Sequence, residues 1–201
     1  MRPAALMIVS NSHVLTAWHV IQQCSEIWVK YPEYKQVEAY IEGTPDENSD
    51  LVLLRTKLPL GGIAAFEFEV RLGAPVYTFG FPYTEVLSAA GNFTLGNVTA
   101  LRGKGNDTRT LQMSAPVQSG NSGGPLLNAN GAVVGIIQAK MTLVHDDIAQ
   151  NTNFAIRSAL AVNYMNSANI TLATISPANA PNLAAEDIAD KAKKFTVPGT
   201  M

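Results

Sequence analysis

The sequence is poor in cysteine and in charged residues, and it has no long apolar run. The single cysteine among 201 residues, Cys24, excludes a disulfide or a cysteine-based zinc site within the chain, and we expect it to be a small core residue. The 14 Lys and Arg residues and 16 Asp and Glu residues leave a net charge of −2 without a basic cluster, which argues against nucleic acid as a partner. No apolar stretch reaches the ~18 residues of a membrane-spanning helix.

The N-terminal residues contain no convincing export signal. A short apolar stretch at 4–9 follows Met1 and Arg2, but Ser10-Asn11-Ser12 is typical of a turn rather than of a cleavage site. We therefore interpret this stretch as a strand, and the sequence leaves the compartment undetermined.

Branched apolar residues, threonine and turn-forming residues dominate what is present, and they predict a mostly β structure. With 47% apolar and 15% charged residues, the chain can bury a real core. Helices are expected at 158–167 and 183–195, and a short helical turn is expected at 20–24. Strands are expected at 4–10, 13–17, 26–31, 35–41, 50–54, 74–81, 94–102, 109–115, 125–127, 132–140 and 154–157.

The loop at 118–125 is rich in glycine and small polar residues, and it is the centre of the functional argument. Gly stands two places before Ser122 and directly after it, so the hydroxyl can be held exposed while a substrate backbone approaches closely. The amides of Gly120 and Ser122 can converge on one point, as an oxyanion hole requires. A flexible hairpin loop would have the same composition, and a serine hydroxyl is a poor nucleophile without a base.

Two upstream residues, His19 and Asp50, can supply that base and a carboxylate to orient it. His19 follows an apolar strand, and taken alone it could equally be a core histidine. Asp50 opens the apolar run at 51–54, where a partly buried carboxylate needs a partner, although it could merely cap a turn. Asp46 is a rival carboxylate in the surroundings of a solvated loop. Together His19, Asp50 and Ser122 form the set that acyl transfer through a serine requires.

The three segments around these residues resemble the motifs of trypsin-like serine peptidases. They are Thr16-Ala17-Trp18-His19-Val20, Asp50-Leu51-Val52-Leu53-Leu54 and Gly120-Asn121-Ser122-Gly123-Gly124-Pro125. Asn121 and the close spacing of the motifs most resemble the bacterial HtrA (Deg) branch without a PDZ domain. The resemblance implies an all-β fold of two six-stranded antiparallel barrels of the chymotrypsin type. It implies a serine endopeptidase that acts on proteins or peptides, without a cofactor or a metal.

The resemblance covers about residues 4–168 and sets the expected domain boundaries. We expect a peptidase domain at 1–175, with a first barrel (1–72), a second barrel (73–157) and a helix (158–169), followed by a linker and a short amphipathic helix at 176–201. HtrA proteins usually have a longer N-terminal segment, so the first barrel is expected to lack its N-terminal strand. Trimer contacts usually lie in that segment, so we expect a monomer, with an oligomer as the alternative. Relatives are often exported, which is compatible with a periplasmic or other extracytoplasmic place.

The resemblance also implies a substrate pocket beside Ser122. Its walls are expected to carry no acidic residue, which predicts cleavage after small or medium aliphatic side chains rather than after Arg or Lys. Asn121 stands where digestive trypsins carry the Asp that pairs with a new N-terminus, so that activation switch is expected to be absent. The predicted pocket residues are Pro116, Val117, Gln118, Ile137, Gln138 and Ala139.

Three other interpretations remain open. The loop matches the G-x-S-x-G elbow of α/β-hydrolases, but Gly123-Gly124-Pro125 opposes the helix that this fold needs after the serine. His145-Asp146-Asp147 could suggest a metal site, although adjacent residues in a polar loop are usually solvated. The serious rival is an inactive or latent protease-fold module that binds extended peptides along 138–140, because a barrel without its first strand could leave the site malformed.

Overall fold

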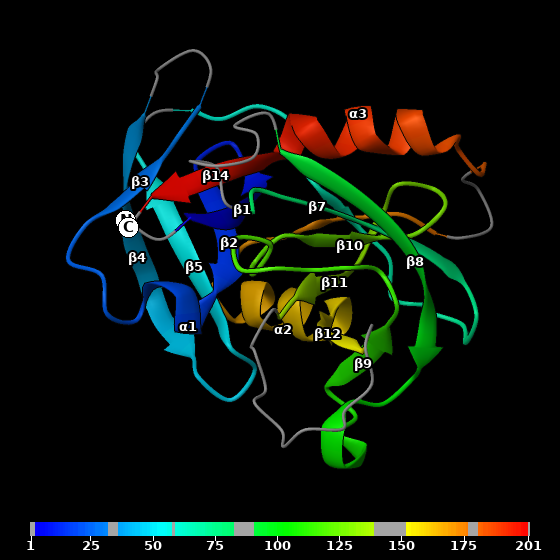
Figure 1. The fold of residues 1–201 in the computed structure, drawn as a ribbon. Coiled ribbons are helices and arrows are strands. Elements are labelled where there is room, and N and C mark those ends of the chain that lie inside the picture. Colours follow the sequence, from blue (N-terminus) through cyan, green and yellow to red (C-terminus); the bar gives the residue numbers. More distant parts are fainter. Residues whose placement is uncertain are drawn as a thin grey trace.

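Two antiparallel β-barrels, which lie side by side in Figure 1, make up most of the structure. The computed structural model describes residues 3–31, 36–57, 59–82, 91–138, 152–176 and 181–200. This is the all-β, two-barrel fold that the sequence predicts. None of the helices in the described ranges is long and apolar enough to span a membrane. The helices are α1 (Trp18–Ile21), α2 (Ser158–Ser167), α3 (Ala185–Phe195) and the 3₁₀ helix η1 (Lys104–Asn106).

The first barrel is closed, in the strand order β1-β14-β3-β4-β5-β2. Its apolar interior explains the closure, since residues 51–54 of β5 and most of β1 and β2 are buried. Its strands are β1 (Pro3–Ser10), β2 (His13–Ala17), β3 (Ile27–Val29), β4 (Val37–Asp46), β5 (Leu51–Thr56) and β14 (Thr196–Thr200).

Strand β14 corrects the expectation of an incomplete first barrel. No strand precedes β1 in the described chain, but β14 pairs antiparallel with both β1 and β3 and so provides the sixth strand (Figure 1). The register places Pro3 opposite Thr200, which brings the two ends of the described chain together. The sequence gives little sign of this strand, because Pro198 and Gly199 are both unfavourable inside a sheet. Pro198 is tolerated since its carbonyl still accepts a hydrogen bond from the backbone N–H of Lys30 (2.9 Å).

The second barrel is built from strands that follow one another along the chain. The order β10-β7-β8-β9-β12-β11 becomes a ring through the pairing of β10 with β11. Two short strands, β6 (Ala65–Phe66) and β13 (Ala173–Thr174), extend it beside β11 in parallel. The six strands of the ring are β7 (Pro75–Gly80), β8 (Asn92–Ala100), β9 (Thr110–Met113), β10 (Pro125–Leu127), β11 (Val133–Ile137) and β12 (Asn153–Arg157).

Helices α2 and α3 hold the chain segments that follow the second barrel against the body of the protein. In α3, Ile188, Ala192 and Phe195 recur at helical spacing, are buried, and belong to the same apolar cluster as the interior of the first barrel. In α2, the hydroxyl of Tyr164 accepts a hydrogen bond from the backbone N–H of Leu53 in β5 (3.2 Å). Helix α3 therefore leads directly into β14 from a fixed position.

Candidate active site

His19 lies at the junction of β2 and α1, close to where β5 begins. The backbone N–H of Trp18 donates to the carbonyl oxygen of Asp50 (3.0 Å), and β2 pairs with β5 from Ala17 opposite Leu51 onward. The His19 side chain is one-fifth exposed. The pairing of β2 with β5 thus places the partly accessible imidazole of His19 beside Asp50, the residue that precedes β5.

Asp50 is the residue that this imidazole meets. Its backbone is left-handed (φ 58°), an uncommon conformation that Asp tolerates better than most residues, and its side chain is 6% exposed. One carboxylate oxygen, Oδ1, accepts the backbone N–H of His19 (2.8 Å), and the other, Oδ2, bonds to Nδ1 of the same residue (2.7 Å). The rival Asp46 instead accepts the backbone N–H of Ser49 (3.0 Å) and caps the turn between β4 and β5.

A third donor reaches Asp50 from the second barrel. Nε2 of Gln138, one residue beyond β11, donates to Oδ2 of Asp50 (2.8 Å). Burial alone would raise the pKa of Asp50, but the hydrogen bonds from His19 and Gln138 outweigh it, so the pKa lies below its ordinary value. Asp50 is therefore ionised at neutral pH. From the sequence we predicted that Gln138 lines the substrate pocket. Nothing in the sequence around Gln138 indicated its contact with Asp50.

The loop before β10 has the backbone geometry that the glycines predicted. The N–H of Asn121 donates to the carbonyl of Gln118 (3.0 Å), and Gly120 between them has φ 100°. A side chain at Gly120 would place its Cβ 2.5 Å from the carbonyl oxygen of Phe81, so only glycine fits. Within the described residues, neither the amide of Gly120 nor that of Ser122 donates a backbone hydrogen bond.

Ser122 is held against the first barrel through its own backbone and that of its neighbour. Its carbonyl accepts the N–H of Ala5 in β1 (3.2 Å), and the side chain is largely buried at 5% exposure. Gly123 has φ 82°, and a Cβ there would lie 2.0 Å from Oγ1 of Thr16 in β2. The serine loop is thus docked on the two strands that lead to His19. No hydrogen bond joins Ser122 to His19 within the described residues.

The remaining predicted site residues have different settings. Pro116 and Gln118 are exposed and Val117 is partly buried, whereas Ile137 is fully buried in the core of the second barrel. Ile137 would therefore contribute backbone rather than side chain to a pocket wall. Ala139 lies outside the described residues, as do the residues of the alternative metal site, His145, Asp146 and Asp147.

The sequence did not suggest that the side chain of Asn121 would be buried with its oxygen lacking a hydrogen bond from the described residues. Its side chain is 2% exposed, and Oδ1 accepts no hydrogen bond from the described part of the chain. A side chain at Gly80 would approach the same oxygen to 2.7 Å, so β7 passes very close to the serine loop.

Comparisons with known proteins agree with this geometry. The sequence model of the trypsin-like peptidase domain matches residues 5–136. The chain is 43% identical over 198 residues to the uncharacterised protein y4bJ of Sinorhizobium fredii, covering 96% of this chain and 31% of that protein. It is 31% identical over 170 residues to the serine protease Do-like HtrA of Lactococcus lactis, covering 78% and 41%. The chain therefore spans less than half the length of these curated relatives.

Solved structures extend the likeness to three dimensions. The serine endoprotease from Yersinia pestis matches with a TM-score of 0.65 at 28% identity, covering 82% of this chain and 57% of that one. The HtrA-type protease AlgW, solved with a decapeptide, matches with a TM-score of 0.66 at 27% identity, covering 82% and 50%. By its sequence and its fold, the chain belongs to the trypsin-like peptidase family and resembles the HtrA proteases within it.

Proposed function

We propose that this domain is a serine endopeptidase in which Ser122 is the nucleophile, His19 the general base and Asp50 the residue that orients His19. The observation that carries the proposal is the paired contact of Asp50 with the backbone N–H and the Nδ1 of His19. An ionised carboxylate can only accept hydrogen bonds, so the hydrogen of a neutral imidazole sits on Nδ1 and Nε2 is the basic nitrogen.

The reaction follows from this tautomer. Ser122 Oγ attacks the substrate carbonyl carbon while its proton passes to Nε2 of His19, and the carbonyl electron pair moves onto oxygen. When the tetrahedral species collapses, His19 gives the proton to the leaving amine and an ester on Ser122 remains. A water molecule then repeats the two steps, releases the acid and restores the serine. Asp50 stays ionised throughout and stabilises the imidazolium.

The unengaged amides of Gly120 and Ser122 are the proposed oxyanion hole. Two backbone donors fixed by a glycine turn need no reorganisation as negative charge develops on the substrate oxygen. Loss of one such donor typically costs about 3 kcal/mol in transition-state stabilisation. The restriction of position 120 to glycine supports this role, because any larger residue would displace the turn.

A fluorophosphonate probe tests the proposal, with Ser122→Ala as the matched control. We expect a single covalent adduct on the parent chain and none on the control, measured by intact-protein mass spectrometry after folding is verified by circular dichroism. Absence of an adduct on folded parent protein would refute an assembled triad.

We further propose that the enzyme prefers small or medium aliphatic side chains before the cleaved bond. Pro116, Val117 and Gln118 bring no negative charge to the wall beside the serine loop. Profiling with a peptide library gives the measurement. Cleavage mainly after Arg or Lys would contradict the preference without touching the proposed mechanism.

The second candidate is a latent or inactive module that binds extended peptides. It is favoured by the absence, within the described residues, of a hydrogen bond between Ser122 and His19, although such contacts often tighten only when substrate binds. Fluorescence polarisation with a labelled extended peptide separates the two. Binding by a parent chain that the probe does not label supports the module, whereas labelling and turnover support the enzyme.

A further inference from the structure

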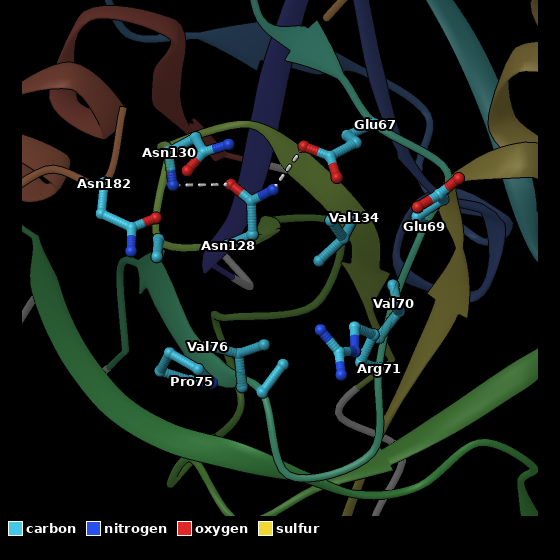
Figure 2. A pocket seen from close by; sticks show the side chains of 12 residues that line it. Glu67, Glu69, Val70, Arg71, Pro75, Val76, Asn128, Asn130, Val134 and Asn182 are labelled. Atoms are coloured by element: carbon cyan, nitrogen blue, oxygen red, sulfur yellow. Dashed lines mark hydrogen bonds between the residues drawn. The ribbon is translucent and has the colours of Figure 1, made fainter. Parts of the chain in front are cut away.

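A cavity of about 230 Å³ opens in the second barrel (Figure 2). Strand β7 connects the two places, since Pro75 lines the cavity and Gly80 packs against Asn121 beside Ser122. Five residues of extended chain separate them by roughly 17 Å. The cavity is therefore distinct from the proposed active site.

Three separate segments build this cavity. Lining residues between 67 and 76 come from the connection between the barrels and the start of β7, residues 128–130 and Val134 belong to the β10–β11 hairpin, and Asn182 precedes α3. Val76 and Val134 are almost fully buried and belong to the core of the second barrel, so they give the cavity an apolar floor. Polar side chains also line it, with Glu67 and Asn128 side by side in Figure 2.

Glu67 is the polar group that distinguishes the cavity. It is 5% exposed, and its Oε2 accepts a hydrogen bond from Nδ2 of Asn128 (2.7 Å). Oδ1 of Asn128 in turn accepts the backbone N–H groups of Asn130 and Ala132 (3.0 Å each), which fixes the amide with its NH₂ toward Glu67. Figure 2 shows this arrangement above Val134, with the second Glu67 oxygen on the cavity side.

This carboxylate is poorly compensated for its burial. Within the described residues Glu67 forms no ion pair, and the Asn128 amide is the one donor to its carboxylate. A buried charge with a single neutral donor is costly unless a further donor or a counter-ion joins it. The free oxygen of Glu67 therefore identifies what a ligand would have to supply: a positive charge that donates hydrogen bonds.

The other charged groups at the mouth define the net field. Glu69 and Arg71 are exposed, and the side chain of neither forms an ion pair or hydrogen bond with a described residue. Lys191 adds a second positive charge nearby, because its Nζ donates to the carbonyl oxygen of the cavity-lining Asn130 (3.1 Å), so the formal charges around the opening balance and recognition rests on Glu67 itself. A hard metal ion is less suited, because the cavity is lined by only two carboxylates and no group of three or more His, Cys, Asp or Glu that could hold a metal ion gathers in the described chain.

We propose that this cavity binds a primary ammonium group on a short aliphatic stem. The ammonium donates to the free oxygen of Glu67, and the stem packs on Val76 and Val134. A free alkylamine and a lysine side chain of another protein share this chemistry. The proposal does not depend on peptidase activity, since none of its residues belongs to the proposed active site.

The test is a titration of the ¹⁵N-labelled chain with pentylamine, followed by heteronuclear NMR, with 1-pentanol as the uncharged comparison. We expect saturable shifts of the Asn128, Val76 and Val134 amides with pentylamine and none with pentanol. Glu67→Gln should weaken binding about tenfold or more, because a hydrogen bond to a charged group is lost. The control Glu186→Gln, at an exposed position on α3, should bind like the parent.

A second variant keeps the test decisive if Glu67→Gln fails to fold. Arg71 is exposed, and Arg71→Gln removes a repulsive charge from the mouth, so pentylamine should bind about twofold more tightly. Weaker or unchanged binding by this variant would contradict the proposed charge recognition.

The source of the amine is read from a parallel titration with Nα-acetyl-lysine methylamide. Shifts with pentylamine alone assign a free amine as the ligand, and shifts with the lysine derivative assign a protein lysine side chain. Absence of shifts with both, or equal shifts with pentanol, overturns the proposal and leaves a water-filled cavity.

Discussion

The two barrels contribute to one proposed site, but they are closed in different ways. The second barrel, which carries Ser122, closes through β10 and β11, neighbours in the sequence. The first barrel, which carries His19 and Asp50, closes only when β14 arrives from the far end of the described chain. His19 and Asp50 thus depend on a strand that follows Ser122 in the sequence. Ser122 depends on the first barrel only through local contacts between the two barrels.

These local contacts make the two halves one unit. Ala5 lies opposite Pro198 of β14 and donates its N–H to the carbonyl of Ser122. Gln138 crosses from the second barrel to Asp50. A change in β14 should therefore destabilise the first barrel and, through Ala5, alter the position of Ser122. A change at Gln138 should affect only the proposed active site.

The largest effect is expected from removal of residues 196–200. Without β14, the edges of β1 and β3 are unpaired and the apolar interior of the first barrel is exposed, so this barrel should lose its folded structure. Hydrogen exchange should show lost protection in β1 and β3, with β8 and β9 still protected, and probe labelling should disappear.

A point variant separates this effect from a truncation artefact. Val197, 4% exposed, points into the first barrel cluster, and Val197→Asp would bury an unpaired charge in the full-length chain. Its matched control is Thr174→Asp in the exposed strand β13. Equal protection in β1 for both variants would show that β14 is dispensable.

The next effect concerns the docking of the serine loop on the first barrel. Gly123→Ala should destabilise by about 3 kcal/mol or more, because a left-handed alanine costs roughly 1–2 kcal/mol and its Cβ would collide with Thr16. Gly73→Ala is the control, with a similar φ of 79° and nothing within 4 Å. Urea unfolding measures both, and similar losses would remove the steric argument.

A smaller, local effect is expected from Gln138→Leu. Asp50 loses a donor, which should raise its pKa toward the ordinary value and reduce turnover about tenfold. The acid limb of the pH–rate profile should then move to higher pH. Gln112→Leu removes a hydrogen bond to the carbonyl of Arg102, remote from the site, and should leave the profile in place. A profile unchanged by Gln138→Leu would exclude a positioning role.

The smallest effect is the acid sensitivity of the His–Asp half. The pKa of Asp50 is lower in the folded than in the unfolded chain, so its contribution to stability is complete above the unfolded pKa of about 3.9 and is lost as pH falls through the folded pKa. Urea unfolding between pH 6 and pH 3 should show this loss in the parent and a shallower slope in Asp50→Asn. Parallel slopes would assign the acid sensitivity to other groups.

Local pattern was sufficient to predict much of this architecture. His19, Asp50 and Ser122 each stand beside an apolar segment with strand composition, and the structure brings His19 and Asp50 into contact through the pairing of β2 with β5. Glycines 120 and 123 reveal backbone needs directly, because positive φ and close approach exclude other residues. Because such backbone requirements depend on the identity of a single residue, they can be predicted from the sequence without knowledge of the fold.

The pairing of strands far apart in the sequence and the direction of individual side chains could not be predicted from local sequence patterns. Strand β14 carries Pro198 and Gly199, and its partners lie nearly a full chain length away, so neither propensity nor local alternation indicates it. Gln138 reaches Asp50 only because β11 ends at the cleft between the barrels. The Glu67 cavity likewise gathers three segments that are separated in the sequence.

The late arrival of β14 also sets an order of events during synthesis. A chain emerging from the ribosome can complete its second barrel first, while β1 and β3 wait for a partner that is made last among the described strands. Closing the first barrel then requires one very long loop closure, which favours slow assembly. The His–Asp half of the proposed site is therefore finished only after translation has passed residue 200.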